Sequence, residues 1–291
     1  MSPLGNRESV FISGGTSGLG LHIAEHFCRL GNPVIFCGRN QETVTSIERH
    51  LKSISPHNQV VFGFRADVTE PEEVSKMFAE LNSLQININI LICNAGAIGP
   101  IDKFLKSDLQ KWQSAFNVNL YGTINLITEA LPWMISKGAG RVIHISGGGA
   151  TSPLLGMSSY AASKAAAVRF IETLSVEYQD SGVTFNSVAP GMLKTQLLDQ
   201  MLDAGPERIG ANLFTKSLAK AESSMDSRAQ AIDLIDFLVS EASGQITGKL
   251  ISAEWDNWGE WPRHLHEIKN SDLYTLRRIT GRDRGQDWGD L

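Results

Sequence analysis

Tyr160 and Lys164 are the two residues whose types and spacing could carry out acid–base chemistry. They lie four residues apart in a stretch of high helix propensity, so both side chains are expected on one face of a helix. A phenol has an ordinary pKa of about 10 and is a weak base at neutral pH. An ammonium group beside it favours the phenolate and lowers that pKa. The pair could therefore exchange a proton with the oxygen of a ketone or an alcohol.

A glycine-rich turn follows the first apolar run and could bind the phosphates of a dinucleotide. Its glycines have the spacing GxxxGxG. Gly14 permits a tight turn, Gly18 lets the backbone approach a pyrophosphate, and Gly20 lets the next helix pack closely on the strand. The N-terminus of that helix attracts an anion. The predicted contacts in this turn are Gly14, Thr16, Ser17, Gly18, Leu19 and Gly20.

Both motifs belong to a longer series that resembles the single-domain branch of the short-chain dehydrogenase/reductase family. The resemblance covers about residues 9 to 253 and implies an NAD(P)-dependent oxidoreductase that interconverts a secondary alcohol and a ketone. It implies that Tyr160 is the general acid and base. The remaining motifs, in family order, are Asp67-Val68, Cys93-Asn94-Ala95-Gly96, Asn117-Val118-Asn119-Leu120, and Pro190-Gly191 with Thr195.

The same resemblance assigns roles around the Tyr–Lys pair. Lys164 would bind the nicotinamide ribose, and Tyr160 would also contact the cofactor. Asn119 would hold a water molecule that links Lys164 to solvent. A polar residue that bends a helix is the alternative for Asn119. The residues that would dock the nicotinamide carboxamide are Pro190, Gly191 and Thr195, although Pro190-Gly191 could also be a structural turn.

Further contacts are expected at the adenine end and along the binding crevice. By resemblance, Asp67 and Val68 would contact the adenine; a turn or helix-capping role for Asp67 is compatible with this. Small residues after the fourth predicted strand would let the cofactor approach closely, and these are Asn94, Ala95 and Gly96.

Arg39 favours NADP(H) over NAD(H) as the cofactor. In a dinucleotide fold, an acidic residue after the second strand binds the ribose 2′-hydroxyl of NAD. The sequence here reads Phe-Cys-Gly-Arg-Asn over residues 36–40 and contains no acid. Arg39 stands where the resemblance would place a clamp for the 2′-phosphate, which a guanidinium suits. A surface arginine near the next helix is the alternative, and NAD remains open.

The chain departs from the family pattern at the residue that orients the substrate. The family usually has a serine 13 residues before the tyrosine, and this position is Gly147. Ser146 is one residue early, and one residue reverses the side of an extended strand. Three glycines follow Ser146 and could re-aim it, so we nominate Ser146. Thr151 or Ser152 could replace it, or no hydroxyl is supplied.

The elements that position these residues alternate between strands and helices. Nearly continuous apolar runs predict strands buried on both faces, at 9–13, 33–37, 59–64, 88–93, 141–146, 183–188 and 249–252. Helices are predicted at 19–30, 41–53, 71–84, 107–137, 158–180 and 223–241, with a bend or break of the fourth at Pro132. This alternation predicts a Rossmann-like, doubly wound parallel sheet with helices on both faces.

Composition limits the other classes of function. The 291 residues carry 26 Lys and Arg against 31 Asp and Glu, a net charge of −5, which disfavours a nucleic-acid partner. The sequence has no apolar run of about 18 residues, so no membrane span is expected. Three apolar-flanked cysteines and the lack of a signal-like N-terminus indicate reduced thiols and a cytoplasmic enzyme.

We divide the chain into a catalytic domain at 1–253 and an extension at 254–291. The extension holds four of the six tryptophans and is expected to pack on the domain or on a neighbouring subunit. His264 and His266 lack the further ligands of a metal site, so no metal is expected. The apolar residues of 192–221 are typical of a substrate lid, although helix packing also explains them. By resemblance, the protein would be a homodimer or homotetramer.

Two other functions are compatible with the sequence. Gly147 raises the alternative of a catalytically weak dinucleotide-binding protein that acts as a sensor or assembly partner. The other alternative is a biosynthetic enzyme that acts on a sugar-linked or carrier-linked ketone. Hydride transfer with a small carbonyl or alcohol substrate is the function that the intact Tyr160, Lys164 and Asn119 favour.

Overall fold

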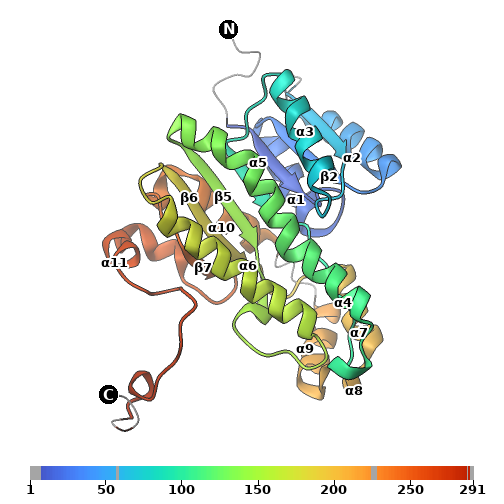
Figure 1. Ribbon diagram of the computed structural model, residues 1–291, viewed down its shortest axis with the longest axis vertical. Helices are drawn as coiled ribbons and strands as arrows, with labels where there is room; N and C mark the ends of the chain where they lie inside the picture. The colour runs from blue at the N-terminus through green and yellow to red at the C-terminus, as the bar shows by residue number, and fades with distance from the viewer. Residues whose placement is uncertain (1–7, 57–58, 224–227, 287, 289–291) are drawn as a thin grey trace.

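Seven parallel strands form one continuous sheet. The computed structural model describes residues 8–56, 59–223, 228–286 and 288. The strands are β1 (Val10–Ser13), β2 (Val34–Gly38), β3 (Val61–Arg65), β4 (Ile90–Cys93), β5 (Gly140–Ile145), β6 (Val183–Ala189) and β7 (Lys249–Ser252). Their spatial order is β3-β2-β1-β4-β5-β6-β7. Each strand lies where the sequence predicts one, and the doubly wound α/β fold is confirmed (Figure 1).

Helices cover both faces of this sheet. One face carries α1 (Gly18–Leu30), α2 (Gln41–Ile54) and α10 (Arg228–Val239). The other carries α3 (Pro71–Ser83), α5 (Gly122–Lys137) and α6 (Ser158–Glu177). The remaining helices are α4 (Leu109–Phe116), α7 (Gln196–Ala204), α8 (Pro206–Ile209), α9 (Ala211–Glu222) and α11 (Leu265–Lys269). Short single turns occur at Phe104–Lys106, Gly148–Ala150, Glu241–Ser243, Trp258–Arg263 and Arg282–Arg284.

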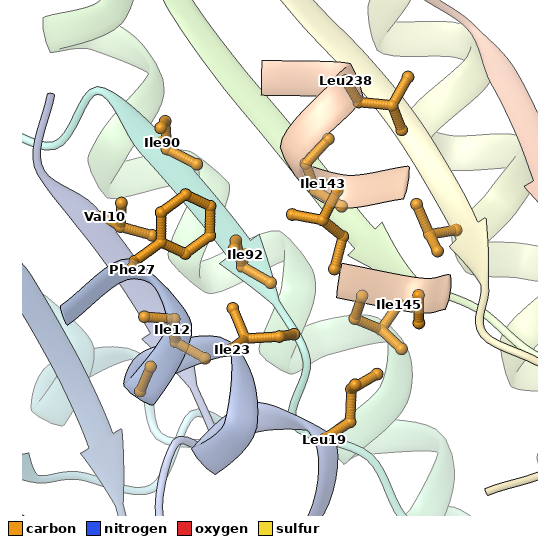
Figure 2. Packing of buried hydrophobic residues seen from close by; sticks show 14 of the residues in the cluster. Val10, Ile12, Leu19, Ile23, Phe27, Ile90, Ile92, Ile143, Ile145 and Leu238 are labelled. Atoms are coloured by element: carbon orange, nitrogen blue, oxygen red, sulfur yellow. The ribbon is translucent and has the colours of Figure 1, made fainter. Parts of the chain in front are cut away.

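Two hydrophobic cores follow from the two faces of the strands. Successive side chains of a strand point to opposite faces, so Val10 and Ile12 enter one core and Phe11 the other. Figure 2 shows Ile12 and Ile92 facing Ile23 of α1 in the first core. Because both faces are covered, the central strands β1, β2 and β4 consist almost entirely of apolar residues.

Local signals in the sequence set the ends of several helices. Gly31 ends α1 with a left-handed φ of 81°, a conformation that glycine adopts readily. Asn40 begins α2, and its side chain accepts a hydrogen bond of 2.8 Å from the backbone N–H of Thr43. Pro71 occupies the first turn of α3, where its missing N–H costs no helical hydrogen bond.

The long helix predicted at 107–137 is interrupted, but not at Pro132. α5 continues through Pro132. The interruption is a π-helical turn at Asn117–Tyr121, which joins α4 to α5. A π turn inserts an extra residue into the helix, and such turns occur often at functional sites. Asn119 lies in this turn and is fully buried. The predicted break at Pro132 is therefore wrong, and a bend there stays a prediction.

Part of the extension at 254–291 contacts the sheet and α10. Trp261 is 3% exposed, belongs to the first core and packs on the ring of Tyr274, with ring centroids 4.4 Å apart. The backbone N–H of Leu250 in β7 donates to the carbonyl of Tyr274 at 2.7 Å. Trp255 is 80% exposed. We keep the division at residue 253 as a proposal.

The three cysteines are reduced, as the sequence predicts. Cys28, Cys37 and Cys93 are buried and form no disulfide. Within the described ranges, no helix is both long enough and apolar enough to span a membrane.

Removal of the Trp261 side chain tests whether the extension contributes to the stability of the domain. Replacement of a buried tryptophan by alanine costs about 3–5 kcal/mol, so we expect Trp261→Ala to lower the unfolding free energy by that amount. Trp255→Ala is the matched control, and it is expected to change the free energy by no more than about 0.5 kcal/mol. Urea unfolding measures both. Equal effects in the two variants would contradict the packing of Trp261.

Candidate active site

The carboxyl ends of the parallel strands lie at one edge of the sheet, and most of the predicted site residues directly follow these ends. β1 has β2 on one side and β4 on the other. Strands β2 and β3 are added on one side of β1, and β4 to β7 are added on the other side, so the order of the strands reverses between β1 and β4. In open α/β sheets, this reversal forms the crevice that binds ligands. The segments that follow β1, β2, β3, β4, β5 and β6 carry residues 14–20, 39, 67–68, 94–96, 146–147 and 190–195. Tyr160 and Lys164 lie on α6, and Asn119 lies in the π turn.

Hydrogen bonds tie the glycine turn to the loop after β4. Asn94 Nδ2 donates to the carbonyl oxygens of Ser13 at 2.9 Å and Gly14 at 3.2 Å. The hydroxyl of Ser13 accepts from the backbone N–H groups of Asn94 and Ala95, each at 3.0 Å. A Cβ on Gly20 would overlap with Asn94 Nδ2, so only glycine fits there. Asn94 therefore holds the turn in place.

The N-terminus of α1 fits the pyrophosphate of a dinucleotide. Ser17 begins the helix, and its side chain makes no capping hydrogen bond. The first turn of α1 contains no acidic residue, so its N–H groups face no competing carboxylate. Gly14 and Gly18 have positive φ of 64° and 54°. A Cβ on Gly18 would lie 3.5 Å from Cγ2 of Thr195, which brings the loop after β6 against this turn.

Arg39 and Asp67 occupy different environments at the adenine end. Arg39 is exposed, and within the described part of the chain its guanidinium has no hydrogen bond or ion pair. It is therefore available to an anionic ligand. Asp67 Oδ1 accepts from the backbone N–H and the hydroxyl of Thr69 at 3.0 and 2.9 Å, a local turn. Val68 is buried, and its carbonyl accepts from Asn125 Nδ2 at 2.9 Å.

Tyr160 and Lys164 both reach the end of β5 from α6. A Cβ on Gly147 would overlap with Tyr160 Oη, so the phenol packs against the α-carbon of Gly147. Lys164 is 4% exposed, and its Nζ donates to the carbonyl of Ile145 at 2.6 Å. The predicted common helix face is confirmed by these two contacts. A Cβ on Gly96 would lie 3.6 Å from Lys164 Nζ, which places the loop after β4 beside it.

Burial decides the protonation of both groups. Desolvation at the hydroxyl raises the pKa of Tyr160 to about 12, although part of the ring remains accessible. Desolvation also lowers the pKa of Lys164 to about 8, against a small opposing influence of Cys93. A phenol with its pKa lowered by the ammonium, as the spacing predicts, is not found here. Desolvation is the cause of the raised pKa of Tyr160, and the charge of Lys164 is not among its causes.

Asn119 links three elements through its side chain. Oδ1 accepts from the backbone N–H of Ala97 at 2.8 Å, and Nδ2 donates to the carbonyl of Ala97 and to Ser163 Oγ, each at 2.8 Å. Ser163 Oγ in turn donates to the carbonyl of Tyr160 at 2.9 Å. The π turn therefore fixes the loop after β4 relative to the face of α6 that carries Ser163. The predicted water-holding role stays a prediction.

Ser146 points away from Tyr160. Its hydroxyl is buried and has no hydrogen-bond partner in the described structure, while its backbone N–H donates to the carbonyl of Val188 at 2.7 Å. Gly147 is extended, with φ −176° and ψ 169°, so residues 146 and 147 face opposite sides. The three glycines do not re-aim the serine. Thr151 and Ser152 are exposed. The orienting role of Ser146 stays a prediction without a supporting contact.

A residue after β7 that sequence reasoning did not assign lies against the loop after β6. Gly191 has φ 80°, and a Cβ there would lie 2.5 Å from Glu254 Oε2. Glu254 follows β7 and so lies over Pro190-Gly191, the predicted carboxamide site. Ser13 and Ser163 were also missed. Ser163 carried a usable signal, because it lies three residues after Tyr160 and thus one helical turn away.

Comparisons with known proteins identify relatives over most of the chain. The profile of the family described as "short chain dehydrogenase" matches residues 8–205. The chain is 33% identical to the 3-oxoacyl-(acyl-carrier-protein) reductase FabG of Rickettsia prowazekii over 204 residues, which are 69% of this chain and 79% of that protein. It is 27% identical to the FabG of Buchnera aphidicola over 84% of this chain and 94% of that protein.

A solved structure supports the same fold. A variant of the actinorhodin polyketide ketoreductase with NADPH superposes on this chain with a TM-score of 0.75, at 22% sequence identity. The match covers 85% of this chain and 95% of that chain. At this level of identity, the likeness establishes the fold alone.

The contact between Tyr160 and Gly147 predicts that a side chain at residue 147 is not tolerated. Insertion of a methyl group into a filled space costs about 1–3 kcal/mol, so Gly147→Ala should lower the unfolding free energy by that amount. Gly148→Ala is the matched control, because a Cβ there would have nothing within 4 Å. Urea unfolding compares the two variants. A Gly147→Ala protein as stable as Gly148→Ala would contradict the contact.

Proposed function

The chain belongs to the short-chain dehydrogenase/reductase family of NAD(P)-dependent oxidoreductases, and from this premise we propose that it reduces a ketone to a secondary alcohol with NADPH. The observation that carries the proposal is the meeting of Tyr160 and Lys164 at the end of β5, beside the crevice between β1 and β4. Bound NADPH would supply a hydride to the carbonyl carbon and become NADP⁺.

Tyr160 would supply the proton to the carbonyl oxygen. With its pKa raised to about 12, its phenol is protonated at neutral pH and is ready to act as an acid. The reverse reaction needs the phenolate as a base, which this burial disfavours.

Lys164 would serve both the cofactor and the phenol. With its pKa lowered to about 8, its amine is still mostly cationic at pH 7. Its Nζ has donors to spare beyond the bond to Ile145, because an ammonium carries three. We assign these to the nicotinamide ribose. Asn119 is a positioning residue, since it fixes the loop beside Lys164 and the turn of α6 that carries Tyr160.

We assign NADP(H) as the cofactor on the basis of Arg39. Its exposed guanidinium has no partner among the described residues and follows β2, where the 2′-phosphate would lie. The uncapped N-terminus of α1 would take the pyrophosphate. The actinorhodin ketoreductase named above also carries NADPH. Assembly as a homodimer or homotetramer stays a prediction.

Two alternatives remain as outcomes of the tests. The FabG relatives are named for carrier-linked substrates, which supports a carrier-linked ketone for this chain as well. Gly147 supports a dinucleotide sensor, which would bind NADPH and transfer no hydride to any ketone. Hydride transfer across a ketone panel separates the enzyme from the sensor.

Substitution of Tyr160 tests the proton donor. Loss of a positioned general acid costs about 10²–10⁴-fold in rate, so Tyr160→Phe should lower ketone-dependent NADPH oxidation by that factor. NADPH binding, measured by fluorescence titration, should be unchanged. Tyr121→Phe is the control, since Tyr121 is exposed. Full turnover in Tyr160→Phe would reject the assignment.

Substitution of Arg39 tests the cofactor. A hydrogen bond between charged groups contributes about 1.5–3 kcal/mol, so Arg39→Met should lower the preference for NADPH over NADH by about 10–100-fold. The measurement is the dissociation constant of each dinucleotide. Arg49→Met, an exposed arginine of α2, should leave the ratio unchanged. Tighter binding of NADH than NADPH by the unmodified protein would overturn the assignment.

A further inference from the structure

The outer side of β7 is bound by the extension. β7 is the last strand in the spatial order of the sheet, with β6 on its inner side. The backbone N–H of Leu250 donates to the carbonyl of Tyr274 at 2.7 Å. The N–H of Ser252, two residues further, donates to Asp256 Oδ2 at 2.7 Å. Both acceptors belong to the extension, and Figure 1 shows α11 and the chain that follows it at the β6–β7 end of the sheet.

A buried lysine of β7 binds the backbone of the extension beside Tyr274. Lys249 is 4% exposed, and its Nζ donates to the carbonyl oxygens of Ser271 at 2.8 Å and Leu273 at 3.0 Å. A lysine is rarely buried to this degree unless its charge has partners. These carbonyls are its partners, so the burial of Lys249 depends on the extension. We call residues 271–276 the edge segment.

Two charged residues of α6 hold the other end of the edge segment. Glu172 is 7% exposed, and its Oε1 accepts from the backbone N–H of Leu276 at 2.6 Å. Arg169, one turn earlier on α6, donates to the carbonyl of Leu276 and forms an ion pair with Glu172. The edge segment is therefore bound through its backbone at both ends, by charged side chains of the strand and the helix that it crosses.

The edge segment occupies the place that a further strand would take. An uncovered edge strand presents N–H and C=O groups that pair with a strand of another chain. Two identical edges are self-complementary about a two-fold axis, so a second copy of this chain is the partner that an open β7 would meet. The edge segment itself forms no strand, and Tyr274 has a φ of 59°, outside the extended region. It therefore closes the edge without extending the sheet.

We propose that the edge segment prevents a second copy of this chain from pairing with β7, and that release of the segment makes this edge an interface between two copies. The inference is independent of the proposed function, because it requires neither a cofactor nor turnover. It limits how the intact chain assembles. A homodimer or homotetramer of the intact chain would use faces of the molecule other than the β7 edge.

Removal of the two buried charges tests the proposal in the full chain. Lys249→Met and Glu172→Leu together take away the hydrogen bonds to Ser271, Leu273 and Leu276. Replacement of buried opposite charges by apolar side chains of similar size is often neutral for stability, and urea unfolding checks that the variant is folded. Sedimentation velocity at micromolar concentration should give about twice the mass of the unmodified chain. An unchanged mass in the folded variant would overturn the proposal.

The matched control is Lys269→Met with Glu267→Leu. It makes the same two changes at exposed residues of α11, whose side chains form no hydrogen bond to the edge segment within the described structure. The mass of this control should equal that of the unmodified chain. The same increase in both double variants would show that the introduced apolar side chains cause the association, which would overturn the proposal.

A proline at residue 250 shows whether the association uses β7. Proline has no N–H, and an edge strand accepts it where the N–H faces outward. Addition of Leu250→Pro to the variant with Lys249→Met and Glu172→Leu should return the mass to that of the unmodified chain. If the larger mass persists, the two copies meet elsewhere and the proposal fails.

A change within the edge segment provides the reading if the buried substitutions unfold the protein. Leu276→Pro removes the N–H that Glu172 binds and leaves every residue of the domain unchanged. It should also raise the mass to about twice that of the unmodified chain, and addition of Leu250→Pro should reverse the increase. A Leu276→Pro protein with the mass of the unmodified chain would contradict the proposal.

Discussion

The site depends on the hydrogen bonds that join the end of β1 to the end of β4. Asn94 donates to the carbonyls of Ser13 and Gly14, and this pulls the two loops so close that residue 20 has room only for glycine. The N-terminus of α1 and the Gly96 loop are thereby fixed relative to each other. The glycine turn would hold the phosphates of the cofactor, and the Gly96 loop lies beside Lys164. These hydrogen bonds therefore fix the position of the phosphate site relative to Lys164.

Most of the fold could be predicted from the sequence because its rules act locally. Strands buried on both faces are rich in apolar residues, and such runs are recognisable in the sequence without any knowledge of their neighbours. Gly31 and Pro71 mark helix ends for reasons confined to one turn. The glycine turn and the Tyr–Lys pair are also local. Their meeting at one edge follows from the parallel arrangement of the strands rather than from either motif.

The features that the sequence did not predict share a different cause, because each depends on contacts between elements that are distant in the sequence. In the π turn, the side chain of Asn119 forms hydrogen bonds to Ala97 and to Ser163 of α6. Neither partner is near Asn119 in the sequence. Pro132 is a strong local signal, but α5 continues through it. The pKa of Tyr160 is raised because packing removes water from its hydroxyl, an effect that the spacing to Lys164 cannot reveal.

Burial of Tyr160 connects the unusual glycine with the chemistry. The phenol of Tyr160 packs against the α-carbon of Gly147 and belongs to an apolar cluster with side chains of α7 and α9. This packing excludes water from the hydroxyl, and the desolvation raises its pKa and keeps it protonated. A hydroxyl at residue 147 would supply a hydrogen bond to the phenol and would also occupy its space. With glycine at residue 147, the phenol has no hydrogen-bonding side chain from this position, and it packs directly against the backbone. Because desolvation favours the neutral phenol, Tyr160 would meet a carbonyl group in its protonated form.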